Sequence, residues 1–88
     1  MASSLRDNDK NVFIDEAEDR TGVIYIGERN SRGLFHGNGV LKANTVHYIG
    51  QFYQGTKHFH GREIYTHEVY EGEFKFDFRR GYGIRYTK

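Results

Sequence analysis

The chain has 88 residues, of which 36% are hydrophobic and 16% aromatic, and it contains 11 Gly but no Cys and no Pro. This length holds one small domain and excludes a multi-domain enzyme, and the absence of Cys excludes disulfides and thiolate metal sites. The longest apolar run, residues 23–26, is far shorter than the roughly 20 residues of a membrane-spanning helix, and residues 1–10 are mostly polar. We therefore expect neither a membrane-spanning helix nor a signal peptide.

The formal net charge of +1 hides an uneven distribution of charge along the chain. Residues 1–20 contain six acidic and three basic residues, whereas residues 21–88 contain six acidic and ten basic residues. We therefore predict an acidic, irregular N-terminal arm over residues 1–21 and a basic, aromatic domain over residues 22–88. Val12, Phe13 and Ile14 form the only apolar cluster in this arm, and we expect them to anchor it on the edge of the domain or on a partner.

In chain order, the domain consists of short β-branched and aromatic runs between polar or Gly-containing turns. Gly recurs too often for a helix interior, and no apolar stripe with the helical period continues for long. The expected strands cover residues 23–28, 39–42, 46–53, 62–65, 69–74 and 83–87. The expected turns cover residues 30–33, 42–45, 54–56 and 66–68. Short connections between these strands predict an all-β fold, a single-layer antiparallel meander of about three β-hairpins.

A Tyr-x-Gly element recurs at a regular spacing and divides the domain into units. Tyr25, Tyr48 and Tyr70 begin these elements, at intervals of 23 and 22 residues. Each is followed by a second Gly-containing element, and two motifs that recur in the same order predict a repeat protein whose units stack on one another. The repeat-core residues are Tyr25, Gly27, Gly37, Gly39, Tyr48, Gly50, Phe52, Gly61, Tyr70, Gly72, Phe74, Gly81 and Gly83.

This pattern resembles the MORN repeat, in which each unit forms one β-hairpin. The resemblance covers roughly residues 23–88 as three degenerate repeats and is closest over residues 70–83. In the second repeat, Gly61 is aligned with the first Gly of the second element and Glu63 replaces the last Gly, which predicts a bent or opened sheet at that point. In the third repeat, Asp77 stands in place of the turn Gly and Arg80 in place of the His.

The Gly of each Tyr-x-Gly element lies on the same strand face as the preceding Tyr, because side chains alternate along a strand. A Gly inside a strand weakens it unless something must approach the backbone closely. We therefore expect aromatic rings from neighbouring hairpins to lie over the bare backbone at Gly27, Gly50 and Gly72. The same close approach is expected at Gly39 and Gly83 on the return strands.

Five His residues raise the question of a metal site, with His58, His60 and His67 as its candidate ligands. Two His that alternate on a strand share a face, and zinc accepts such ligands. No Cys and no suitably spaced carboxylate accompany them, so we predict no metal and no cofactor, and interpret the His of the repeat motif as a hairpin residue that hydrogen-bonds the backbone. No Ser lies in a nucleophile motif and no Gly-rich loop opens a helix, so we predict that the chain is not an enzyme.

The third repeat carries the candidate interaction surface. Phe74, Phe76 and Phe78 alternate along the chain and are therefore expected to point to one side of the sheet. The last strand is expected to present an unpaired edge, which accepts a partner by strand addition. The candidate partner-binding residues are Val12, Phe13, Ile14, Phe74, Phe76, Phe78, Tyr82 and Tyr86. The basic residues interleaved with these aromatics are Lys75, Arg79, Arg80, Arg85 and Lys88.

The resemblance to MORN-repeat proteins implies a structural or scaffold subunit that docks other proteins in a larger assembly. It also implies an intracellular, cytoplasmic location, with a cilium, a flagellum or the cytoskeleton as the expected setting. The alternative function is a peripheral membrane adaptor that binds anionic phospholipids through the basic and aromatic third repeat. We expect no nucleic acid and no small-molecule substrate, since the charge of the domain is modest and acidic residues are interspersed among the basic ones.

Overall fold

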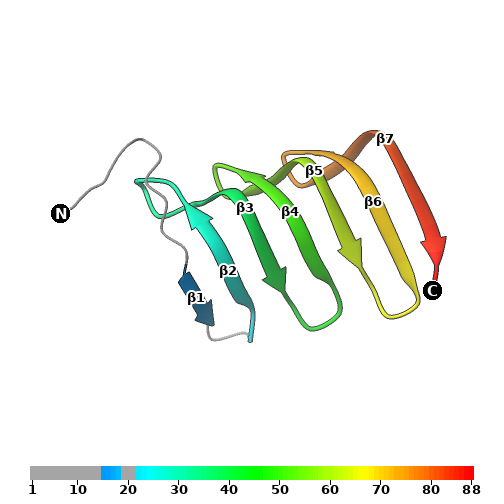
Figure 1. Ribbon diagram of the computed structural model, residues 1–88, viewed down its shortest axis with the longest axis horizontal. Coiled ribbons are helices and arrows are strands. Elements are labelled where there is room, and N and C mark those ends of the chain that lie inside the picture. Colours follow the sequence, from blue (N-terminus) through cyan, green and yellow to red (C-terminus); the bar gives the residue numbers. More distant parts are fainter. Residues whose placement is uncertain (1–14, 19–21) are drawn as a thin grey trace.

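The computed structural model describes residues 15–18 and 22–88, which form one open antiparallel sheet of seven strands (Figure 1). The strands follow chain order across the sheet and each pairs with the next, so the fold is the all-β, single-layer antiparallel meander that the sequence predicts. The strands are β1 (Asp15–Glu18), β2 (Ile24–Arg29), β3 (Phe35–Lys42), β4 (His47–Tyr53), β5 (Thr56–Ile64), β6 (Glu68–Lys75) and β7 (Phe78–Thr87).

Strand β1 comes from the part of the chain that was predicted to be an irregular arm. Its four residues, three of them acidic, pair antiparallel with β2. One edge of the described sheet is therefore a short acidic strand. The predicted anchor residues Val12, Phe13 and Ile14 lie outside the described residues.

Three strands begin earlier than the sequence predicts. Strand β3 begins at Phe35, β5 at Thr56 and β7 at Phe78, whereas the expected strands begin at residues 39, 62 and 83. The Gly and polar residues of these segments resemble a loop when they are considered in sequence alone. In the fold they continue the main-chain pairing with the preceding strand, since Phe35 pairs with Arg29, Thr56 with Tyr53 and Phe78 with Lys75.

The second and third hairpins close with the same two-residue turn. Gln54 and Gly55 have φ values of 50° and 87°, and Phe76 and Asp77 have values of 49° and 75°. A type I′ turn requires positive φ at both central residues, and its twist matches that of the paired strands. The first of these turns lies where the sequence predicts one. The second is indicated only by the resemblance, in which Asp77 stands in place of the turn Gly, because Phe76 is not a residue typical of turns.

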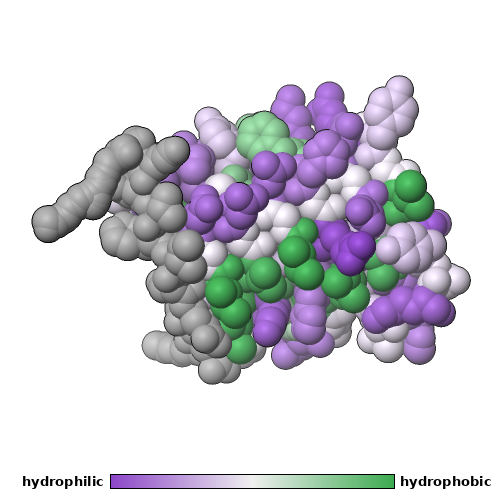
Figure 2. Space-filling model, viewed as in Figure 1, coloured by the Kyte–Doolittle hydropathy of each residue, from purple (hydrophilic) through white to green (hydrophobic). Residues whose placement is uncertain are grey.

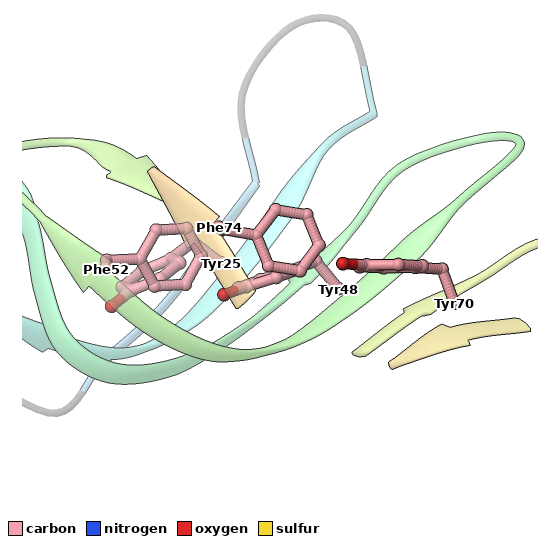
Figure 3. Packing of buried hydrophobic residues seen from close by; sticks show 5 residues of the cluster. All are labelled: Tyr25, Tyr48, Phe52, Tyr70 and Phe74. Atoms are coloured by element: carbon pink, nitrogen blue, oxygen red, sulfur yellow. The ribbon is translucent and has the colours of Figure 1, made fainter. Parts of the chain in front are cut away.

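The core consists of aromatic rings gathered on one face of the sheet (Figure 3). Phe52 lies between Tyr25 and Tyr48, with ring centroids 5.5 and 5.0 Å away, and all three rings are at most 2% exposed. Phe74 likewise lies between Tyr48 and Tyr70, at 5.3 and 5.4 Å. All four contacts are edge-to-face, the geometry that the ring quadrupole favours. Each Phe therefore joins the Tyr of its own repeat to the Tyr of the preceding one.

Each of these Tyr rings lies over a pair of facing Gly in its own hairpin. Gly27 is opposite Gly39, and a Cβ added to Gly39 would lie 2.5 Å from the Tyr25 hydroxyl oxygen. In the second hairpin, the Tyr48 hydroxyl also donates a hydrogen bond to the Gln51 carbonyl at 2.8 Å, which holds the far end of the ring. The expected close approach is confirmed, but the expectation that the ring comes from a neighbouring hairpin is wrong, because the Tyr two residues before the first Gly already covers the pair.

Gly61 occupies a different place in the second repeat from the predicted one. It faces Gly50 directly, so it is the last Gly of its element rather than the first. Glu63 therefore lies two residues beyond the Gly pair, opposite Tyr48, and β5 stays paired with both neighbouring strands through Ile64. The prediction that Glu63 replaces a Gly and opens the sheet is wrong, since the Gly pair of this repeat is complete.

The opposite face of the sheet carries aliphatic side chains. Ile26, Val40 and Ile49 are paired in register across three strands, and alternation places them on the face away from the Tyr rings. Figure 2 shows apolar residues gathered in a band that crosses one face of the molecule. Ile49 is 45% exposed, so this face is partly open to solvent.

We expect Gly72→Ala to lower the free energy of unfolding by about 2–3 kcal/mol. A Cβ at this position would lie 2.5 Å from the Gly83 Cα and the Tyr82 carbonyl oxygen, backbone atoms that no side-chain rotation can move away. Urea denaturation of the variant and the wild type measures this loss.

The matched control is Gly33→Ala, where a Cβ would meet no atom within 4 Å but φ is +83°. This variant should lose only the roughly 1–2 kcal/mol of a strained left-handed residue. An unfolding midpoint for Gly72→Ala above that of Gly33→Ala would contradict the close-approach account.

Candidate functional site

A buried ion cluster joins the second and third repeats. Glu63 on β5 is 5% exposed, and its carboxylate lies 2.7 Å from Lys57 Nζ and 2.9 Å from Arg79 Nη2. Burial by itself raises the pKa of the Glu63 carboxyl, but the hydrogen bonds and positive charges of Lys57 and Arg79 outweigh this effect and hold the pKa below its ordinary value. Both carboxylate oxygens are occupied by cations, so the arrangement suits packing rather than proton transfer.

The same two cations lie over rings of the core. Arg79 Cζ is 4.4 Å from the ring centroid of Tyr70, and Lys57 Nζ is 5.6 Å from that of Tyr48, both within the range of cation–π attraction. In the first repeat, Phe35 takes the equivalent position and stacks on its own Tyr at 3.8 Å. Arg79, one of the basic residues interleaved with the aromatic residues of the third repeat, is therefore held against the core.

The His of the repeat motif connects each hairpin to the turn of the next one. His36 Nδ1 accepts a hydrogen bond from the Gln54 amide at 3.1 Å, and His58 Nδ1 accepts one from the Phe76 amide at 3.2 Å. The interpretation as a hairpin residue that bonds the backbone is confirmed for His36. In the second repeat the bond is made by His58 and not by His60, the His beside Gly61 that the repeat pattern aligns with His36. Within the described part of the chain, no group of three or more His, Cys, Asp or Glu side chains has a metal-binding arrangement.

The structure separates the three Phe residues that were expected to share a face. Phe74 is 3% exposed and belongs to the core, so it is not available to a partner. Phe76 lies in the turn between β6 and β7, where the left-handed backbone of Phe76 and Asp77 interrupts the alternation. Phe78, the first residue of β7, is 74% exposed. The prediction of a shared face is wrong because it treats a turn as a continuous strand.

Strand β7 is exposed along its whole length and pairs only with β6. We define the β7 surface as Phe78, Tyr82, Ile84 and Tyr86. Tyr82 is 86% exposed and Ile84 is 67% exposed, which is unusual for large apolar side chains. Sequence reasoning missed Ile84, although it alternates in step with the predicted residues Tyr82 and Tyr86 and so shares their strand face.

A second group of exposed rings lies at the turn end of the second and third repeats. We define the aromatic–histidine cluster as Tyr53, His58, Phe59 and Phe76. The His58 ring lies 4.5 Å from Phe59, 4.8 Å from Phe76 and 5.2 Å from Tyr53. Only Phe76 was predicted as a site residue, and the signal that was overlooked is a Phe between two His at a position where the other repeats have Gly.

A family model for the MORN repeat matches residues 31–44, 48–66 and 70–87, which together are more than half of the chain. The chain belongs to the MORN-repeat family. The second and third matches begin at the Tyr of their hairpins, as the repeat pattern predicts, and MORN repeats commonly take part in protein–protein or protein–membrane interactions. None of the described residues forms a helix with the length and hydropathy that a membrane-spanning segment requires.

Replacement of Glu63 by Gln should destabilise this MORN-repeat domain by about 1–3 kcal/mol, because Lys57 and Arg79 would lose the charge that they share between two repeats. The effect should depend on pH. The Glu63 pKa in the folded state lies below its ordinary value, so its contribution is fully present above the unfolded-state pKa and is lost as the pH falls through the folded-state pKa.

Urea midpoints at pH 7 and pH 3 test this expectation, and the difference between the wild type and Glu63→Gln should shrink at the lower pH. The control is Glu71→Gln, which removes a half-exposed pair with Arg62 at 3.3 Å and should change stability by less than about 1 kcal/mol. Similar losses for the two variants at pH 7 would count against the buried cluster.

Proposed function

We propose that this MORN-repeat chain is a non-enzymatic docking module that binds another protein along β7, as a structural subunit of a larger assembly. The observation that carries the proposal is that all ten residues of β7 are exposed and that β7 pairs on one side only. Four of those residues, the β7 surface, have large apolar side chains.

An exposed edge strand offers unpaired N–H and C=O groups, to which a strand of a partner adds by main-chain hydrogen bonds. Aromatic side chains beside such an edge supply much of the binding free energy in protein interfaces. Natural edge strands are often protected by Pro or by charges, and β7 contains no Pro. Its residue Arg79 is held by the buried Glu63, and Arg85 lies 3.8 Å from Glu68 on β6.

The chemistry of the described residues supports a binding role over a catalytic one. Glu63 is the buried charged residue of the core, and both of its oxygens bind cations. The Nδ1 atoms of His36 and His58 accept backbone hydrogen bonds. These groups maintain the fold, and a scaffold needs no further chemistry from them.

A partner protein is favoured over an anionic membrane because the basic residues of the third repeat are largely engaged within the fold. Three of the five predicted for lipid contact have partners in the chain: Arg79, Arg85 and Lys88. Binding to lipid headgroups would depend on the two other basic residues, Lys75 and Arg80, and on long-range electrostatic attraction, which salt screens. The ciliary or cytoskeletal setting stays a prediction from the family.

Affinity capture from the source cell, followed by mass spectrometry, tests the proposal. We expect the double variant Tyr82→Ser/Ile84→Thr to recover its protein partner at least about tenfold less efficiently than the wild type, because the main apolar contacts of the β7 surface are removed. Both positions are highly exposed, so the free energy of unfolding should change by no more than about 0.5 kcal/mol per substitution.

The matched control is Ile49→Thr, which removes another exposed aliphatic side chain, on β4. This variant should capture the same partner as the wild type. Equal capture by all three proteins would exclude β7 as the docking strand. Salt-sensitive sedimentation with anionic vesicles, without any captured protein, would favour the membrane-adaptor function instead.

A further inference from the structure

Phe59 has a backbone conformation that suits Gly rather than a bulky residue. Because Gly61 belongs to the facing Gly pair, the residue two positions earlier corresponds to Gly37 in the first repeat and to Gly81 in the third. Those two Gly have φ values of +84° and +69°, and Phe59 has a φ of +66°. A side chain with a Cβ is disfavoured in this left-handed region, and Gly avoids that penalty.

The Phe59 ring does not compensate for this strain by filling the core. It is 54% exposed, and its ring neighbours are His58, at 4.5 Å, and Tyr53, at 6.3 Å, which are themselves on the surface. The second repeat thus has a strained, exposed Phe where its neighbours have an unstrained Gly. Local strain of this kind is typical of positions selected for function rather than for stability.

The other rings of the aromatic–histidine cluster are held in place by the backbone. His58 Nδ1 accepts the Phe76 amide hydrogen bond at 3.2 Å, so the proton of the neutral imidazole lies on Nε2. The turn that carries Phe76 is fixed on the neighbouring hairpin by two hydrogen bonds, from the Asp77 amide to the Lys57 carbonyl at 2.9 Å and from the Lys57 amide to Asp77 Oδ1 at 2.8 Å. The cluster is therefore a preorganised surface, which lowers the entropy lost on binding.

A surface hollow of about 370 Å³ adjoins this cluster. It is lined by the exposed Phe59, by the basic residues Lys75 and Arg80, by the acidic residue Glu73 and by part of the buried residue Phe74. The imidazoles of His58 and His60 complete the lining. An exposed aromatic ring with an excess of positive charge around it is complementary to an apolar side chain flanked by carboxylates.

We propose that the aromatic–histidine cluster and this hollow form a second protein-interaction site, separate from the β7 surface, which binds an acidic peptide segment carrying an apolar anchor residue. Phe59 contacts the anchor and dominates the binding free energy. Lys75 and Arg80 attract the acidic flanks. The proposal does not depend on strand addition at β7.

The test uses the full chain as bait for a random peptide library displayed on phage. We expect the enriched peptides to combine Asp or Glu with a Phe, Trp or Leu, and to bind Phe59→Gly at least about tenfold more weakly than the wild type by fluorescence anisotropy. Phe59→Gly should also unfold at an equal or higher urea concentration than the wild type, because Gly relieves the strain at φ +66°. Loss of binding together with retained or increased stability distinguishes a binding residue from a structural one.

Two further variants test separately whether the positive charge of Arg80 contributes to peptide binding and whether the β7 surface takes part in it. Arg80→Glu should weaken peptide binding, whereas the β7 variant Tyr82→Ser should bind the peptides like the wild type. The proposal is overturned if no peptide is enriched, if the enriched peptides lack acidic residues, or if they bind Phe59→Gly as tightly as the wild type. A lower urea midpoint for Phe59→Gly would overturn the strain argument, and Phe59-dependent sedimentation with phosphatidylserine vesicles but no peptide binding would assign the site to a membrane.

Discussion

The packing of a Tyr ring on a pair of facing Gly residues makes a stable single-layer sheet possible in this protein. A sheet normally buries its apolar face against a second layer of helices or strands. Here the second layer consists of side chains, because the absence of two Cβ atoms lets the ring of Tyr25, Tyr48 or Tyr70 lie against the backbone of its own hairpin. The rings of Phe52 and Phe74 then fill the space between successive Tyr residues and make one continuous row (Figure 3).

Three kinds of contact connect each repeat to the next, and all of them cross the same boundary between hairpins. A Phe packs on the preceding Tyr, a His accepts the amide hydrogen of the following turn, and an amide of that turn bonds a carbonyl of the preceding hairpin. Between the second and third repeats, the buried Glu63 adds an ion cluster. Such nearest-neighbour coupling is typical of repeat proteins, and it leaves the repeat at each end with one uncovered side. The exposure of β7 follows from this architecture.

Much of the fold could be predicted from the sequence because the packing of a Tyr ring on the backbone requires a Gly only two residues away in the chain. A Gly two residues after a Tyr on the same strand face predicts a ring on the backbone, and its period gives the number of hairpins. The turn at Phe76 and Asp77 could not be predicted in this way, since the β6–β7 pairing imposes positive φ on a residue that does not favour it. The wrong alignment of Gly61 has a similar origin, because only the pairing with Gly50 shows which Gly it is.

The candidate site was less predictable because it depends on residues that are distant in sequence. Tyr53, Phe59 and Phe76 come from three strands or turns and meet only when two hairpins pack together. The pairing of Glu63 with Lys57 and Arg79 likewise depends on the register of β5 and on the position of β7. By contrast, Tyr82 and Tyr86 follow from simple alternation along one strand, and sequence analysis found them.

The Tyr–Gly contact also constrains how such a chain can change by single substitutions. Replacing Gly39 while Tyr25 is present brings a Cβ into the ring, and replacing Tyr25 first leaves an uncovered stretch of backbone on the core face. Either intermediate is less stable than the starting protein, although a smaller residue at one position would make room for a larger one at the other. The two positions, 14 residues apart in sequence, should therefore diverge as a pair or not at all.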